Sequence, residues 1–152
     1  MTDNSHVQQV RDRVDRVLAT RHDELYQQVL ACVADGLAID AATITPGASL
    51  LDDLGAESLD FLDLLFRLET AYDVKIPRDG MRSVAQDGLV DGFEVVGVLT
   101  PAALERLRVL MPEVAQARLI PGLRTHQIPH LFTVETFVRL VAWQFAESGT
   151  SH

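Results

Sequence analysis

Ser58 is the residue whose setting in this sequence most clearly indicates chemistry. It follows a glycine turn at Gly55 and stands directly before a segment that is acidic on one side and apolar on the other. A serine becomes a nucleophile when a neighbouring base activates it, and no histidine, lysine or cysteine lies near Ser58 in the sequence. We therefore interpret Ser58 as a point at which a separate enzyme attaches a group. The alternative is that Ser58 serves only as the N-cap of the helix that follows.

The expected position of Ser58 at a helix N-terminus suits an attached phosphate. Free backbone N–H groups and the positive end of the helix dipole favour an anion there, by about 0.3–1 kcal/mol at an exposed site. Gly55 allows the preceding loop to turn sharply and to leave the serine uncovered. Leu59, directly after the serine, is placed to be an exposed apolar anchor for a partner.

Carboxylates dominate the sequence around Ser58. Between residues 49 and 73 a single cation, Arg67, accompanies seven acidic residues: Asp52, Asp53, Glu57, Asp60, Asp63, Glu69 and Asp73. A charge run of this kind is commonly a solvated helix face. Because the interspersed cations of such a face are missing, we favour steering toward basic protein surfaces. The residues predicted to dock partners are Glu57, Leu59, Asp60, Asp63 and Glu69.

Other candidate constellations are weak. His126 and His130 are separated by three residues, but Pro129 opposes an α-helix and no third ligand is evident, so we predict no metal site. The glycines from Gly88 to Gly97 lack the spacing and the lysine of a phosphate-binding loop. No catalytic triad can be argued from residue order, and we predict that the chain is not an enzyme.

Composition indicates one globular domain. The 152 residues are 47% hydrophobic and 23% charged, with a formal net charge of −9 that argues against nucleic acid as a partner. No apolar run approaches the roughly 18 residues of a membrane helix, and no signal peptide is evident. The single cysteine, Cys32, sits on an apolar helix face, where a buried inert thiol is expected. These features predict a cytoplasmic protein.

The spacing of apolar residues predicts the elements that position the serine. We expect helices over 5–20, 23–36 and 58–72, a loop over 41–55, and a last helix from the N-cap Thr133. The helix over 58–72 has an expected apolar face of Leu59, Leu62, Leu65, Phe66 and Leu68. Residues 149–152 should be disordered.

The segment between these elements differs in character. Residues 86–100 predict a short strand pair or an ordered loop, and Thr100-Pro101 predicts the start of another helix, with a hydrophobic staple of Leu99 and Leu104. Its stripe, Leu104, Leu107, Leu110 and Met111, should fold onto the apolar bundle. Residues 114–120 should add a turn or two.

About half of the chain resembles the acyl carrier protein family. The stretch from Ile44 to Asp60, which includes Asp53-Leu54-Gly55-Ala56-Glu57-Ser58-Leu59-Asp60, matches that family's attachment site almost position for position. The stretch from Tyr72 to Pro77 is similar to the end of its second helix, and Phe132 to Phe137 to the start of its last helix. The chain departs from the family in having Glu57 before the serine, where the family usually has Asp, and in the some fifty residues that replace the short third helix.

The resemblance implies a mostly α fold, an acyl-carrier-like helical bundle with an extra N-terminal helix and an inserted segment containing at least one helix. The expected organisation is a single carrier domain over 1–152, with its core in 22–78 and 131–147, the extra helix in 5–20 and the insertion in 79–130. The resemblance also implies 4′-phosphopantetheine, transferred from coenzyme A to Ser58 by a phosphopantetheinyl transferase.

The function implied is an acyl carrier for fatty-acid, polyketide or specialised lipid synthesis. Its partners would be acyl-loading enzymes, synthases and acyltransferases with basic docking surfaces. Two alternatives are an aminoacyl or peptidyl carrier and an unmodified helical adaptor. The insertion is either extra packing that covers the bundle or a device that selects cargo or partners.

Overall fold

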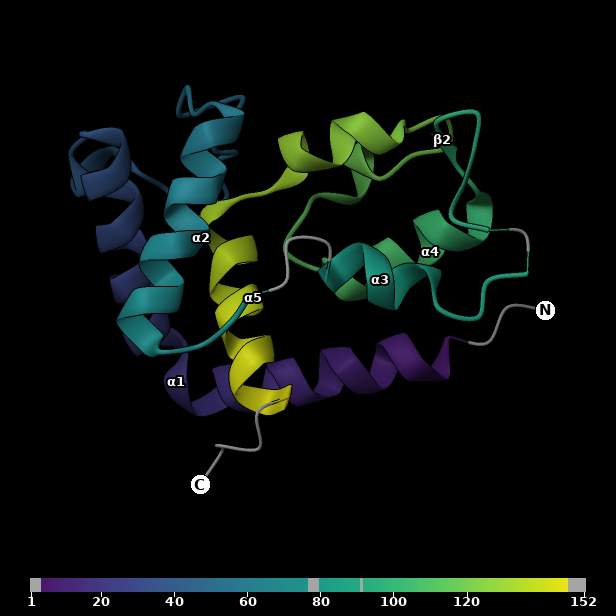
Figure 1. Cartoon of the computed structure of the whole chain (residues 1–152), viewed down its shortest axis with the longest axis horizontal. Coiled ribbons are helices and arrows are strands. Elements are labelled where there is room, and N and C mark those ends of the chain that lie inside the picture. The colour runs from purple at the N-terminus through teal and green to yellow at the C-terminus, as the bar shows by residue number, and fades with distance from the viewer. Residues whose placement is uncertain (1–3, 77–79, 91, 148–152) are drawn as a thin grey trace.

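The computed structural model describes residues 4–76, 80–90 and 92–147, and within them the fold is mostly α-helical (Figure 1). The α-helices are α1 (Ser5–Leu37), α2 (Ser58–Tyr72), α3 (Gly80–Gln86), α4 (Pro101–Leu110) and α5 (Val134–Glu147). Short 3-10 helices are η1 (Ala41–Thr43), η2 (Gln116–Arg118) and η3 (Thr125–Leu131), and the strands are β1 (Glu94–Val95) and β2 (Val98–Leu99). The predicted helical fold class is confirmed. None of the helices in the described ranges is long and apolar enough to cross a membrane.

The two helices expected over 5–20 and 23–36 form one element. No glycine or proline lies between Ser5 and Asp35, so nothing in the backbone ends the helix near residue 21. Figure 1 shows that the axis of α1 changes direction between its purple half and its blue half. The sequence predicted that the helix ends at residue 36. The last helical residue is Leu37, and the C-cap is Ala38, whose φ of 56° is left-handed.

A first hydrophobic core joins the second half of α1 to α2 and α5. Leu25 and Val29 of α1, Leu68 of α2, and Phe137 and Val141 of α5 are fully buried there. The last helix is capped as its sequence predicts, because Thr133 Oγ1 accepts a hydrogen bond of 3.2 Å from the N–H of Thr136. The second half of α1, α2 and α5 thus form a three-helix bundle around this core, which holds α2 in position.

A second hydrophobic core lies between the first half of α1 and the insertion. Val7 and Val10 of α1 pack there with Leu104, Leu107 and Met111, all of them buried. The expectation that this stripe folds onto the bundle is therefore wrong in its detail, since the stripe packs chiefly on the N-terminal extension of α1. Phe132 and Trp143 pack against both cores and connect them.

The insertion begins with α3, a helix that its sequence did not predict, and continues through a hairpin to α4. β1 and β2 pair antiparallel, so of the two predictions for residues 86–100 the structure has the strand pair. Val96 and Gly97 form the turn and have positive φ. Thr100 Oγ1 caps α4 by accepting a hydrogen bond of 3.2 Å from the N–H of Ala103, which confirms the predicted helix start. A single η2 turn lies in the 114–120 segment, and η3 forms in a stretch where Pro129 argued against an α-helix. The predicted disorder of residues 149–152 lies outside the described residues.

Candidate functional site

Ser58 is the first residue of α2, and its side chain is exposed. The N-cap of the helix is Glu57, not Ser58. The N–H of Glu57 donates to Asp60 Oδ2 at 2.8 Å, in a capping box that satisfies the helix start without the serine. Within the described part of the chain, the Ser58 hydroxyl makes no hydrogen bond. The hydroxyl is therefore accessible to an enzyme and is not needed to cap α2.

The loop before Ser58 is held by its own hydrogen bonds. Ser49 is fully buried, and its N–H donates to Asp53 Oδ2 at 2.8 Å. The N–H of Ala56 donates to the carbonyl of Leu50 at 2.9 Å. Gly55 turns the chain with a φ of 74°, a left-handed conformation that glycine adopts without strain. The loop thus presents the start of α2 in a defined position.

The insertion contacts this loop directly. Arg118 Nη2 lies 2.8 Å from Asp52 Oδ2, and His130 Nδ1 lies 2.7 Å from Asp52 Oδ1. The hydrogen bond with His130, together with the one from Arg118, lowers the pKa of Asp52 below its ordinary value. Sequence reasoning placed Asp52 among unbalanced carboxylates. It missed both partners because they lie 66 and 78 positions away, where no local pattern connects them.

Backbone bonds reinforce this attachment. Ser49 Oγ donates to the carbonyl of His130 at 2.7 Å, and the N–H of Leu50 donates to the carbonyl of Phe132 at 3.1 Å. Ser49 and Thr133 also form an isolated antiparallel bridge. The loop before the serine and the end of the insertion are therefore one connected structure.

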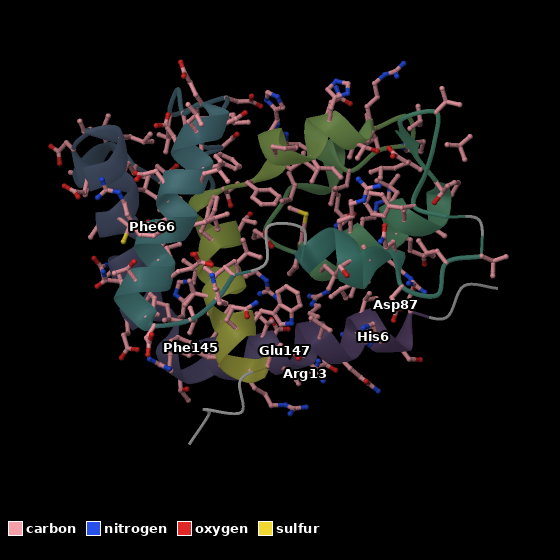
Figure 2. The ribbon with its side chains drawn as sticks, in the orientation of Figure 1. His6, Arg13, Phe66, Asp87, Phe145 and Glu147 are labelled. Carbon is pink, nitrogen blue, oxygen red and sulfur yellow. The ribbon has the colours of Figure 1, made fainter. Side chains whose placement is uncertain are left out.

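An exposed apolar stripe runs along α2 from the serine end. Leu59 is 74% exposed, Leu62 46% and Phe66 64%. Figure 2 shows Phe66 on the side of α2 that lies away from α5. Leu62 and Phe66 belong to the apolar face that the sequence predicted for this helix, but they are not buried in the bundle. The bundle instead buries Leu64, Leu65 and Leu68 of α2, because α1 and α5 cover only that side of the helix.

The predicted acidic docking residues differ in their surroundings. Asp63 is about half exposed and lies 2.7 Å from Arg67 Nε, while Arg67 Nη1 lies 2.6 Å from Asp35. Asp60 belongs to the capping box, and Glu69 accepts a 2.7 Å hydrogen bond from the N–H of Ile76. Asp60 and Glu69 are thus half-buried and bond backbone N–H groups, while Glu57 and Asp63 are exposed, Asp63 in its ion pair with Arg67.

The cavity described in the bundle near the start of α2 is small. A cavity of only about 10 Å³ lies between α1 and α2, lined in part by Cys32, Val33, Leu50 and Leu64. Burial raises the pKa of the Cys32 thiol, consistent with the inert thiol expected there. His126 and His130 line an open groove on the outside of the molecule, where His130 bonds Asp52.

The site fits an attached phosphodiester. An exposed hydroxyl stands at the start of a 15-residue helix, whose first N–H groups and dipole favour an anion. A helical bundle with an exposed serine at this place has the arrangement expected of a carrier protein.

Comparisons with known proteins identify the family. The family model described as a phosphopantetheine attachment site matches residues 27–81, a stretch that contains Ser58. An acyl carrier protein AcpXL of Rhizobium etli is 38% identical over 69 residues, 45% of this chain and 75% of that protein. An acyl carrier protein of Syntrophobacter fumaroxidans is 42% identical over 57 residues, 38% of this chain and 70% of that protein. One of Helicobacter pylori is 36% identical over 64 residues, covering 42% and 82%. No solved structure matches the chain significantly.

This chain belongs to the acyl carrier protein family, whose prosthetic group is 4′-phosphopantetheine. The matched stretch covers the last third of α1, the loop and α2, and it extends to residue 81. The first two thirds of α1 and most of the insertion lie outside it.

Proposed function

We propose that this protein carries acyl groups as thioesters on a 4′-phosphopantetheine arm attached to Ser58. The observation that carries the proposal is the exposed Ser58 hydroxyl at the start of α2, inside the stretch that matches the family's attachment site. In the transfer, Ser58 Oγ forms a bond to the phosphorus next to the pantetheine of coenzyme A. The phosphoanhydride bond breaks, adenosine 3′,5′-bisphosphate leaves, and the serine proton passes to a base of the transferase.

The role of the chain itself is to present the serine and to steer partner enzymes toward it. The arm supplies a terminal thiol that holds the acyl group. The helix start stabilises the phosphodiester, the capping box keeps that start in place without Ser58, and the exposed stripe of Leu59, Leu62 and Phe66 offers apolar contact to partners. Glu57 and Asp63 favour partners with basic docking surfaces. Catalysis belongs to those partners: a phosphopantetheinyl transferase, loading enzymes, synthases and acyltransferases of fatty-acid, polyketide or specialised lipid synthesis.

We also propose that the chain is a single carrier domain. The carrier core in 22–78 and 131–147 shares α1 with the second core, and Phe132 and Trp143 contact both. The extension over 5–20 and the insertion over 79–130 then act as one addition to the carrier, since each buries the apolar side of the other.

Intact mass spectrometry tests the proposal. The unmodified protein is incubated with coenzyme A, Mg²⁺ and a phosphopantetheinyl transferase of broad specificity. The expected result is the addition of one phosphopantetheinyl group, located by peptide mapping on the peptide that contains Ser58. An unchanged mass, under conditions in which a known carrier is modified, would contradict the proposal and favour an unmodified adaptor. Loading with acyl rather than aminoacyl groups then separates an acyl carrier from a peptidyl carrier.

A further inference from the structure

A groove of about 680 Å³ lies between the insertion and the loop that precedes Ser58. The insertion forms most of it, through the segment from η2 to η3, and Asp52 of the loop completes the wall. The volume falls within the range of small-molecule sites, about 300–1,000 Å³. The groove lies largely outside the stretch that matches the family model.

The groove lies at the serine end of α2. Asp52 precedes Ser58 by six residues, which limits their Cα separation to roughly 22 Å even in a fully extended chain. The loop is not extended, because the N–H of Ala56 bonds to the carbonyl of Leu50. Figure 1 shows the N-terminal end of α2 and the yellow-green η3 segment at the same, upper end of the molecule. The bonds of Asp52 to Arg118 and His130 keep the groove beside the loop.

The lining combines apolar and polar groups. Ile120, Pro121 and Leu123 offer apolar contact, and His126 is exposed, with no partner in the part of the chain that the structure describes. Among the described residues that line the groove, Asp52 alone carries a carboxylate, and it is paired with Arg118 and His130 of the insertion. The groove therefore interrupts the acidic surface around the serine, because Arg118 and His130 accompany its carboxylate.

We propose that this groove receives the outer part of the arm attached to Ser58 and the acyl group next to its thioester. The proposal rests on the proposed function. A pantetheine arm has amides that need hydrogen-bond partners and methylene groups that need apolar contact, and the lining provides both. The cavity of about 10 Å³ between α1 and α2 is too small to hold these groups. The insertion thus supplies a binding groove for the arm and its acyl group on the outside of the bundle.

Disulfide capture of the arm's thiol tests the proposal. Ile120→Cys and Ala117→Cys each place a thiol at an exposed position of the groove, in a Cys32→Ser background that removes the native thiol. Each variant is converted to the phosphopantetheinylated form and equilibrated with reduced and oxidised glutathione. Closure of the intramolecular disulfide transfers two electrons and two protons to glutathione disulfide, and intact mass with and without reductant gives the closed fraction.

Lys75→Cys is the matched control. Lys75 is exposed and lines a groove of similar size, about 650 Å³, beyond the other end of α2. The 15 residues of α2 separate the two ends by about 22 Å. If the arm lies in the insertion's groove, the effective concentration of its thiol should be at least about tenfold higher at residues 117 and 120 than at residue 75. Circular dichroism confirms that the variants are folded.

The outcomes separate the two proposals. Capture at both groove positions that exceeds the control at least tenfold supports the inference. If protein that carries the arm shows capture no greater than at residue 75, the inference is wrong. The groove would then be a candidate binding site for a partner protein. If no variant accepts the arm although each is folded, the proposed function itself is wrong, and this inference falls with it.

Discussion

Arg118 Nη2 and Asp52 Oδ2 lie 2.8 Å apart although 66 positions separate the two residues. Arg118 belongs to the insertion, and Asp52 belongs to the loop that presents Ser58. His130 bonds the other oxygen of the same carboxylate at 2.7 Å. This three-residue cluster, Asp52 with Arg118 and His130, attaches the part of the chain outside the family's common core to the part that defines the family.

We predict that Asp52→Asn loosens this attachment. The amide keeps the size of the side chain but loses the charge that both partners bind. Because the pairs are partly exposed, the global free energy of unfolding should fall by no more than about 1 kcal/mol. Amide hydrogen exchange in residues 116–131 should increase clearly, and exchange in α4 should not. Unchanged exchange in 116–131 would show that the backbone bonds of Ser49 and Leu50 suffice.

The lowered pKa of Asp52 predicts that the stability of the protein falls in acid. The pKa of Asp52 is lowered in the folded protein from an ordinary value of 3.8. Its contribution to stability is therefore complete above that value and is lost as the pH falls through the lowered pKa. Thermal unfolding below pH 4 should show a smaller loss for Asp52→Asn than for the wild type.

Ser58→Ala should abolish modification and leave the fold intact. Glu57 and Asp60 cap α2 without the serine, and the side chain is exposed, so the free energy of unfolding should change by no more than about 0.5 kcal/mol. Intact mass and thermal unfolding check the two parts. A variant that still gains the group would place the attachment elsewhere, and a variant that unfolds would give Ser58 a structural role.

Asp63→Lys should slow association with the transferase. The change reverses a charge on the exposed side of α2, where steering acts on the association rate more than on folding. We expect kcat/KM for modification to fall about tenfold at low salt and to recover in part as salt rises. Glu105→Lys is the control, because it makes the same change at an exposed position of α4. Equal effects of the two variants would mean that only net charge matters.

Phe66 and Leu68 should respond in opposite ways to truncation. Phe66 is 64% exposed and Leu68 is fully buried. Phe66→Ala should leave stability nearly unchanged and weaken partner binding, while Leu68→Ala should cost about 2–5 kcal/mol because it leaves a cavity in the bundle. Chemical denaturation and partner titration measure both. A stability loss above about 1 kcal/mol for Phe66→Ala would place its ring in the core.

The buried carboxyl of Glu113 should give the stability of the protein a second dependence on pH. Burial raises the pKa of its carboxyl, which accepts a 2.6 Å hydrogen bond from Thr136 Oγ1 and lies 3.7 Å from Arg139 Nε. A raised folded pKa means that stability declines as the pH rises from the ordinary value of 4.5 through the raised one. Glu113→Gln keeps an acceptor for Thr136 and should remove this decline. Denaturation at pH 4.5 and 7.5, with the exposed Glu105→Gln as control, measures it.

Local signals in the sequence were sufficient for the elements that carry the candidate site. Thr100 and Thr133 cap the helices that follow them, and α2 begins at Ser58, because caps and apolar periodicity act over three to four residues. The carrier family likewise followed from a continuous stretch around Ser58. The position of the cap at Glu57 was missed, since Ser58 and Glu57 both precede the same apolar run.

The sequence alone thus indicated the family, most of the helical elements and the start of α2 at Ser58. The tertiary structure decided which side of α2 is covered, and so exposed Leu62 and Phe66, because burial depends on where α1 and α5 lie. It also decided that Asp52 is paired with Arg118 and His130, that the insertion packs on the first half of α1, and that a groove forms beside the serine loop. These features arise between residues tens of positions apart, where folding, not local spacing, brings the side chains together.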